Sequence, residues 1–277
     1  MYGVVTRNEP ELDWSAFDRG FYEVKDVTGR HAEPTSDAVN MVSCFGDNTV
    51  QAEDDDLVAV SADGEPATHE RPYFDWTHVC PTNEQYREGL LEIVADCAAA
   101  SPDVRLDDVG FPREEYCHCD RCEARFEESE YDDRFAWRAS VITDFVAEAA
   151  DRVPGKTYMT LYPDPYPGHL YRREGIDVEA LAAHVDEFVV PLYDTHYGTT
   201  YWLETIAKGF ESLLSVPFSV ELYAVDVDVD DLVHATEVAA EYGTDVLFGY
   251  DASNATAALR RLEADRREGE SFGPGDA

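Results

Sequence analysis

Three of the chain's six cysteines lie within six residues, in the stretch "YCHCDRC" that holds Cys117, Cys119 and Cys122. A structural zinc site takes four soft ligands in a tetrahedron, and thiolates are preferred. Cys80 directly precedes a predicted helix and supplies a fourth thiolate if the two segments are neighbours in the fold. We therefore expect a structural Zn²⁺ site with no open position for catalysis.

Two alternatives to a four-cysteine site remain open at this stage. The cysteines could be unrelated free thiols, or His118 or His78 could replace one of the thiolates. Cys97 lies on the apolar side of a predicted helix and is expected in the core, while Cys44 at a strand end could line the core or a pocket.

Carboxylates at strand ends form the second group of chemically useful residues. Asp107 and Asp108 end the apolar strand "VRLDD", and Glu221 interrupts the apolar run "PFSVELYA". Hydrolysis of a glycosidic bond needs one carboxylic acid and one carboxylate on opposite sides of the anomeric carbon. Asp108 and Glu221, on roughly opposite sides of one predicted barrel mouth, are the expected pair.

Each of these carboxylates also has a structural interpretation. Adjacent strand residues point to opposite faces, so only one of Asp107 and Asp108 should face inward unless a bulge intervenes. If both converge, their repulsion raises the pKa of one of them. Either aspartate could instead be a strand-end cap or a surface acid, and Glu221 could form a buried ion pair with an arginine.

Aromatic and polar residues recur where successive predicted strands end, which suits a site for sugar rings. The expected substrate-binding residues are Asp107, Trp76, Tyr162, Tyr193, Asp194, His196, Tyr223 and Asp251.

The elements that must position these residues alternate between strand and helix from about residue 104 onward. Strand patterns at 104–111, 156–163, 187–194, 217–224 and 245–251 are each followed by a helical segment. Such alternation predicts a parallel sheet with right-handed crossovers. Because the strands read as buried on both sides, we expect a (β/α)8 TIM barrel whose functional face is the carboxyl end of the strands.

The first hundred residues are less regular. We expect strands at the N-terminal "MYGVV" and at 39–45, and a helix over 81–100. Residues 57–60 could be a barrel strand or one arm of a hairpin turning at Asp63-Gly64. We expect eight barrel strands in a single domain, 1–277, with a flexible tail over about 268–277.

An acidic strand end about nine residues before a CxCxxC motif, with a partner cysteine about forty residues upstream, resembles glycoside hydrolase family 42. The resemblance implies a retaining (β/α)8 glycosidase with zinc on Cys80, Cys117, Cys119 and Cys122. It also implies that Asp108 is the acid/base and Glu221 the nucleophile. The chain departs from the family because Asp107-Asp108 replaces the family's Asn-Glu pair, and aspartate is one methylene shorter.

Composition limits the remaining classes. A net charge of −38, from 59 acidic and 21 basic residues, is typical of proteins from salt-loving archaea and lacks the basic patch that nucleic-acid binding needs. No apolar run is long enough for a membrane span, and no signal peptide is recognisable, so a cytoplasmic location is expected. A homo-oligomer is compatible with the sequence.

The sequence thus favours a glycoside hydrolase acting on a small carbohydrate. The alternatives are a barrel hydrolase or lyase on another polar substrate, using Asp107, Asp108 and either Asp194 or His196 with a second metal, and a non-catalytic carbohydrate-binding barrel.

Overall fold

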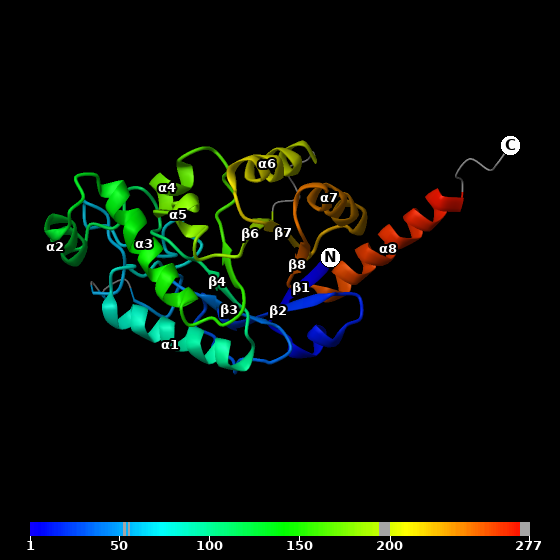
Figure 1. The fold of residues 1–277 in the computed structure, drawn as a ribbon, viewed down its shortest axis with the longest axis horizontal. Coiled ribbons are helices and arrows are strands. Elements are labelled where there is room, and N and C mark those ends of the chain that lie inside the picture. Colours follow the sequence, from blue (N-terminus) through cyan, green and yellow to red (C-terminus); the bar gives the residue numbers. More distant parts are fainter. Residues whose placement is uncertain (52–53, 55, 194–199, 272–277) are drawn as a thin grey trace.

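The computed structural model describes residues 1–51, 54, 56–193 and 200–271, and its centre is a closed barrel of eight parallel strands (Figure 1). Each strand pairs with its neighbours in sequence, and β8 pairs with β1 to close the ring, with Val4 opposite Phe248. The predicted (β/α)8 barrel is confirmed.

The strands have these bounds: β1 Tyr2–Thr6, β2 Arg19–Lys25, β3 Val39–Ser43, β4 Val104–Asp107, β5 Thr157–Thr160, β6 Glu187–Leu192, β7 Phe218–Tyr223 and β8 Val246–Gly249. The helices are η1 Glu9–Asp13, α1 Glu84–Ala100, α2 Asp120–Glu128, α3 Arg134–Ala150, α4 His169–Glu174, α5 Val178–Leu181, α6 Thr200–Leu213, α7 Val229–Tyr242 and α8 Ala252–Ser271.

The early part of the barrel differs from the sequence-based expectation in one strand. Residues 57–60 are not a barrel strand: Val58 and Val60 make isolated antiparallel bridges to Val79 and Pro66, the second across the turn at Gly64. The hairpin interpretation is therefore the right one. The missing strand is β2, whose sequence "RGFYEVK" carries three charged residues and so did not read as a buried strand.

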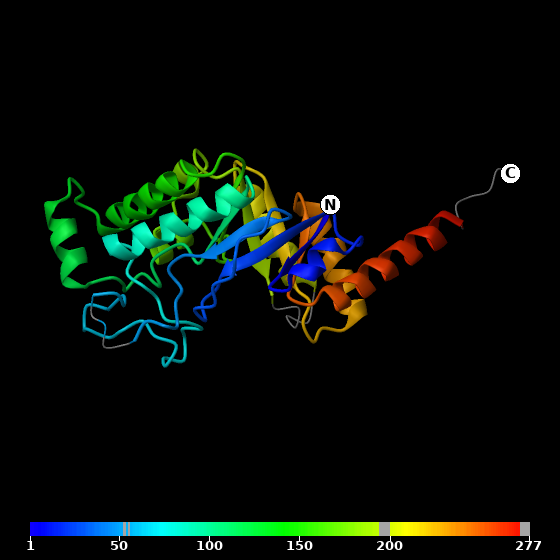
Figure 2. The ribbon, with the colours of Figure 1, turned by 90° about the horizontal axis from the view of Figure 1, so that it is seen from below.

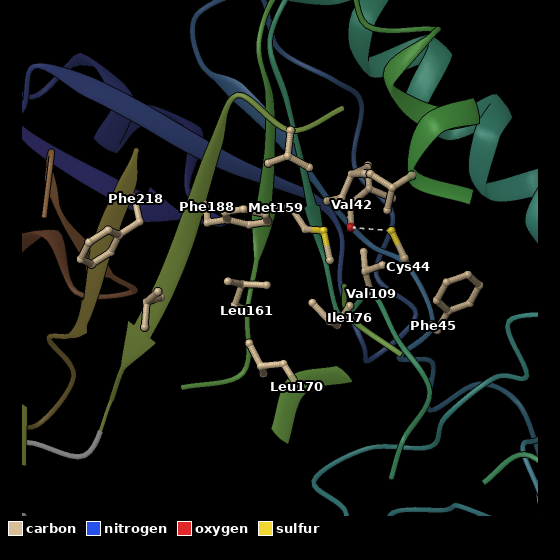
Figure 3. Close-up of a cluster of buried hydrophobic side chains, with 14 of the residues drawn as sticks. Val42, Cys44, Phe45, Val109, Met159, Leu161, Leu170, Ile176, Phe188 and Phe218 are labelled. Carbon is tan, nitrogen blue, oxygen red and sulfur yellow. Dashed lines mark hydrogen bonds between the residues drawn. The ribbon is translucent and has the colours of Figure 1, made fainter. Parts of the chain in front are cut away.

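Side chains alternate between the inside of the barrel and the layer under the helices. The inner cluster consists of Val5, Phe21, Val39, Met41, Tyr158, Val189 and Leu247. The outer cluster includes Phe188, Met159, Leu161 and Phe218, which Figure 3 shows with neighbouring loop residues. Filling of the interior by side chains makes the barrel a packed core with one usable mouth, at the carboxyl end of the strands.

The peripheral helices extend the molecule in two directions. In Figures 1 and 2, α2 lies at the end of the molecule opposite to α8, and α8 projects away from the barrel. Residues 268–271, which we expected in a flexible tail, belong to α8, and 272–277 lie outside the described residues. Within the described part of the chain, no helix combines the length and apolar character that crossing a membrane requires.

The outer core gives a stability prediction. Phe188 is fully buried on β6, so Phe188→Ala leaves a cavity and is expected to lower the free energy of unfolding by about 3–5 kcal/mol. Tyr201→Ala, at a ring that is 64% exposed, should change it by no more than about 0.5 kcal/mol. Urea unfolding in molar salt measures both values, and equal losses would contradict this packing.

Candidate active site and metal cluster

The four cysteines predicted as metal ligands come together. The sulfur atoms of Cys80, Cys117, Cys119 and Cys122 all lie within 4.8 Å of one another and are buried. Cys80 Sγ is 3.7 Å from Cys119 Sγ and 3.4 Å from Cys122 Sγ. Around a tetrahedral zinc with bonds of about 2.3 Å, sulfur atoms are roughly 3.8 Å apart. The cluster therefore has the size of a metal site.

The surroundings of the cluster favour thiolate character. The backbone N–H groups of Val60 and Cys119 donate to Cys117 Sγ at 3.3 and 3.5 Å. Thr82 Oγ1 lies 3.1 Å from Cys80 Sγ and 3.3 Å from that of Cys122. Backbone amides that donate to sulfur support ligand charge in metal sites. These four buried cysteines can hold a metal ion.

The two histidines considered as substitute ligands lie outside this cluster. His118 Nδ1 instead contacts Glu123 Oε1 at 2.6 Å. His78 packs against Phe74 and Trp76, and its burial, with a contribution from Arg173, lowers its pKa to about 3. Cys97 is buried in the core, as expected, and so is Cys44, whose sulfur contacts the Val42 carbonyl (Figure 3).

A buried arginine organises the barrel mouth. Arg105 lies two residues before Asp107 on β4 and shares its inward orientation, above Phe21. Its Nη1 is 2.6 Å from Glu221 Oε2 on β7, its Nη2 is 3.4 Å from Asp107 Oδ2, and its Nε donates to Thr160 Oγ1 at 2.9 Å. One guanidinium therefore joins carboxylates from β4 and β7.

Glu221 is fully buried, as its apolar neighbours in sequence predicted. Besides Arg105, it accepts a hydrogen bond from the Tyr193 hydroxyl at 2.5 Å on Oε1. A Cβ atom at Gly249 of β8 would lie 3.1 Å from the same oxygen, so glycine gives the carboxylate room. The buried ion pair considered as the alternative interpretation of Glu221 is thus present.

Asp108 departs from the strand geometry of Asp107. Its φ is +51°, which turns the side chain away from simple alternation and toward β3, where Ser43 Oγ donates to Oδ2 at 2.5 Å. Burial raises the pKa of Asp108 to about 8, and the adjacent Asp107 carboxylate contributes to the shift. A raised pKa lets a carboxyl group keep its proton closer to neutral pH, as a general acid requires.

The sequence analysis missed a second group of charges at the carboxyl ends of β1 and β2. Glu23 is buried against the Arg7 guanidinium, and Arg7 Nε also lies 3.3 Å from Asp26 Oδ2. Burial raises the pKa of Glu23, Arg7 opposes that rise, and the Asp107 carboxylate adds to it. The Tyr250 ring lies under Arg7, with its centroid 5.3 Å from the guanidinium carbon. The backbone of Tyr250 has a positive φ of 74°.

Arg105 and Glu23 had a signal in the sequence that we did not use. Glu23 stands at the same alternation phase as the inward Phe21, and Arg105 at the same phase as Asp107, so an inward charge could have been inferred at both positions. Tyr250 had no such signal, because its place depends on the unusual backbone after β8.

The expected substrate-binding residues are only partly brought together. Tyr193 and Tyr223 lie side by side at the mouth, with ring centroids 5.3 Å apart. Asp107 belongs to the same network, because it contacts Arg105, which contacts Glu221. Trp76 packs beside Gly46, just beyond β3, and Tyr162 follows β5.

Three further residues of that list have other settings. Asp251 Oδ1 accepts from the Asn254 backbone N–H at 2.9 Å, which is a helix-capping contact at the start of α8. Asp194 and His196 lie outside the described residues.

The mouth therefore holds the Asp108 carboxyl group, whose pKa is raised, and the Glu221 carboxylate, which is ion-paired with Arg105. Asp107 and Glu221 contact the same guanidinium, so two carboxylates from β4 and β7 meet at one cation. Such an arrangement allows acid-catalysed hydrolysis, in which one carboxyl group protonates the leaving oxygen of the substrate.

Comparison with known proteins gives structural matches only. No protein-family model matches the chain, and no curated protein matches its sequence. The structure is similar to the glycoside hydrolase domain of PgaB (BpsB) from Bordetella bronchiseptica, with a TM-score of 0.62, 15% identity, and coverage of 83% of this chain and 74% of that one.

Two further solved structures are similar over most of this chain. Alpha-L-fucosidase isoenzyme 2 from Paenibacillus thiaminolyticus has a TM-score of 0.61 and 11% identity, covering 98% of this chain and 50% of that one. The spore cortex-lytic enzyme SleL from Bacillus cereus has a TM-score of 0.54 and 9% identity, covering 95% and 74%. The chain shares the barrel fold of glycoside hydrolases, at low sequence identity.

The raised pKa of Asp108 gives a prediction about stability and pH. An ordinary aspartate has a pKa of about 3.9 in an unfolded chain, so the stabilising effect of the protonated form is complete below that pH. It is lost as the pH rises through about 8. Between pH 4 and 8 the unfolding free energy of the wild type should therefore fall relative to that of Asp108→Asn. Urea unfolding across this range measures the difference, and parallel curves would contradict the assignment.

Proposed function

We propose that the chain is a glycoside hydrolase in which Asp108 is the acid/base and Glu221 the nucleophile. The observation that carries the proposal is the presence of two differently held carboxyl groups at one barrel mouth. Burial raises the pKa of Asp108 to about 8, whereas Glu221 is ion-paired with Arg105 at 2.6 Å. Two carboxyl groups held in different protonation states are what glycosidic hydrolysis needs.

The roles of the neighbouring residues follow from their contacts. Ser43 orients the Asp108 carboxyl group, and the Tyr193 hydroxyl and Arg105 orient the Glu221 carboxylate through its two oxygens. Asp107 shares Arg105 and is positioned to accept a hydrogen bond from a sugar hydroxyl. The glycosidase barrels among the structural matches support this class of activity, while the resemblance to family 42 remains a prediction.

A non-catalytic carbohydrate-binding barrel is the second candidate. It is favoured by one observation, the complete burial of Glu221, because a nucleophile must reach the anomeric carbon. In that case the Arg105–Glu221 pair is a structural link between β4 and β7, and the mouth binds sugar without cleaving it.

We further propose that the metal held by the four cysteines is zinc with a structural role. All four donors are sulfur, which suits Zn²⁺, and four protein ligands complete its coordination. Cys80 would join the segment before α1 to the segment before α2, so the metal would fix the loop that follows Asp108.

The catalytic proposal predicts the effect of two substitutions. Asp108→Asn and Glu221→Gln should each lower kcat/KM by about a hundredfold or more, because each removes one of the two carboxyl functions. A panel of chromogenic glycosides in molar salt measures this, with Asp177→Asn as control, since Asp177 only caps α5.

The same panel separates the two candidate functions. If the wild type cleaves a glycoside and Glu221→Gln retains that rate while losing stability, Glu221 is not the nucleophile. If no glycoside is cleaved but sugars bind, the non-catalytic barrel is the correct function.

The zinc proposal predicts about one zinc per chain, lost in the Cys119→Ser/Cys122→Ser double variant. Cys97→Ala removes a buried thiol outside the cluster and should keep the metal. Elemental analysis of purified native protein measures the content. Native wild-type protein that is free of zinc would falsify this site.

A further inference from the structure

Most of the exposed aromatic side chains belong to segments that follow the carboxyl ends of barrel strands. Among the described residues, eight aromatic side chains are exposed: Trp14, Tyr73, Tyr131, Tyr162, Tyr166, Tyr193, Tyr201 and Trp202. Six of these belong to segments that leave the carboxyl ends of β3, β5 and β6, the same end as Asp108 and Glu221. Because exposed aromatic surface is unfavourable in water, its concentration around a candidate site indicates a ligand.

Three of these rings share a specific construction. Arg173 lies over the Tyr162 ring at 4.0 Å, Arg113 lies over that of Tyr73 at 5.2 Å, and His169 packs against that of Tyr166 with ring centroids 4.4 Å apart. A basic side chain thus supports each exposed tyrosine from one side. We call these three pairs the backed tyrosines.

An acidic residue contacts each supporting side chain in turn. Glu174 Oε1 accepts from Arg173 at 3.1 Å, Asp164 Oδ2 lies 2.8 Å from His169 Nδ1, and Glu115 lies 3.7 Å from Arg113. Each ring is therefore part of a three-member stack of acid, base and aromatic group. Such support orients a ring before any ligand binds, which reduces the entropy lost on binding.

The backed tyrosines flank the loop that carries the proposed acid. Tyr73 follows β3 and Tyr162 and Tyr166 follow β5, and β4 with Asp108 lies between those strands. The two sides also approach each other, because Arg138 Nη2 donates to the backbone carbonyls of both Arg113 and Arg173, at 2.7 and 2.8 Å. A ligand that spans these rings passes over the end of β4.

We propose that the backed tyrosines bind successive sugar rings of an extended, uncharged glycan. The three rings lie on two loops, after β3 and after β5, so they offer contacts to more than one sugar ring, and aromatic faces suit the apolar faces of sugar rings. The net charge of −38 disfavours polyanionic glycans. The inference rests on the proposed carbohydrate function and changes its substrate from a small glycoside to a chain.

Adsorption to insoluble polysaccharides tests this inference without requiring turnover. We would use the Asp108→Asn/Glu221→Gln protein, which cannot hydrolyse the probe, with mannan, xylan, cellulose and chitin in molar potassium chloride. It should bind at least one of the four. Adding Tyr73→Ala, Tyr162→Ala and Tyr166→Ala should weaken that binding by about tenfold or more.

Trp14→Ala is the matched control, because Trp14 is an exposed aromatic residue beside α8 and away from the mouth. Thermal unfolding confirms that every variant is folded. The inference is overturned if none of the four polysaccharides is bound, or if Trp14→Ala weakens binding as much as the triple substitution.

The outcomes also separate this inference from the proposed activity. Wild-type cleavage of chromogenic glycosides without adsorption refutes the glycan platforms and leaves the glycosidase proposal standing. Adsorption that depends on the three tyrosines supports the platforms, and it refutes the glycosidase proposal if the wild type cleaves neither a chromogenic glycoside nor the polysaccharide that it binds.

Discussion

The Arg105 guanidinium and the Glu221 carboxylate meet inside the barrel, where neither is exposed to solvent. Removing two charges from water costs several kcal/mol per ion, and only close contact with further hydrogen bonds offsets that cost. Thr160 and Asp107 complete the surroundings of Arg105, and Tyr193 completes those of Glu221. Residues from β4, β5, β6 and β7 thus depend on a single pair of charges.

This constraint explains the arrangement of the mouth. With Arg105 fixed below it, Asp107 continues the inward alternation of β4, and the next residue cannot also face the axis in regular strand geometry. The positive φ of Asp108 resolves this conflict by turning its carboxyl group toward Ser43. A backbone conformation that is uncommon for a residue other than glycine therefore occurs where the proposed chemistry requires it.

The barrel was predictable from residue 104 onward because short apolar strands and helices alternate there without interruption. The cysteine cluster was predictable because three cysteines within six residues of sequence must lie close together in space. The β2 strand was missed because it carries charged residues at both ends and at Glu23, and period and apolarity alone do not distinguish such a strand from a loop. The Arg105–Glu221 contact was foreseen only as an alternative, since nothing in a sequence says which arginine crosses a barrel to reach a given glutamate.

The long segment between β3 and α1 carries Cys80, while the other three cysteines follow β4. An ion on all four would close a ring of roughly 40 residues that includes α1 and β4, and ring closure removes conformational entropy from the unfolded chain. The bond would thus act on the disordered state as well as on the native one. The metal would thus cross-link the long segment between β3 and α1 to the loop after β4. Elsewhere in the barrel, packing of helices holds the corresponding segments.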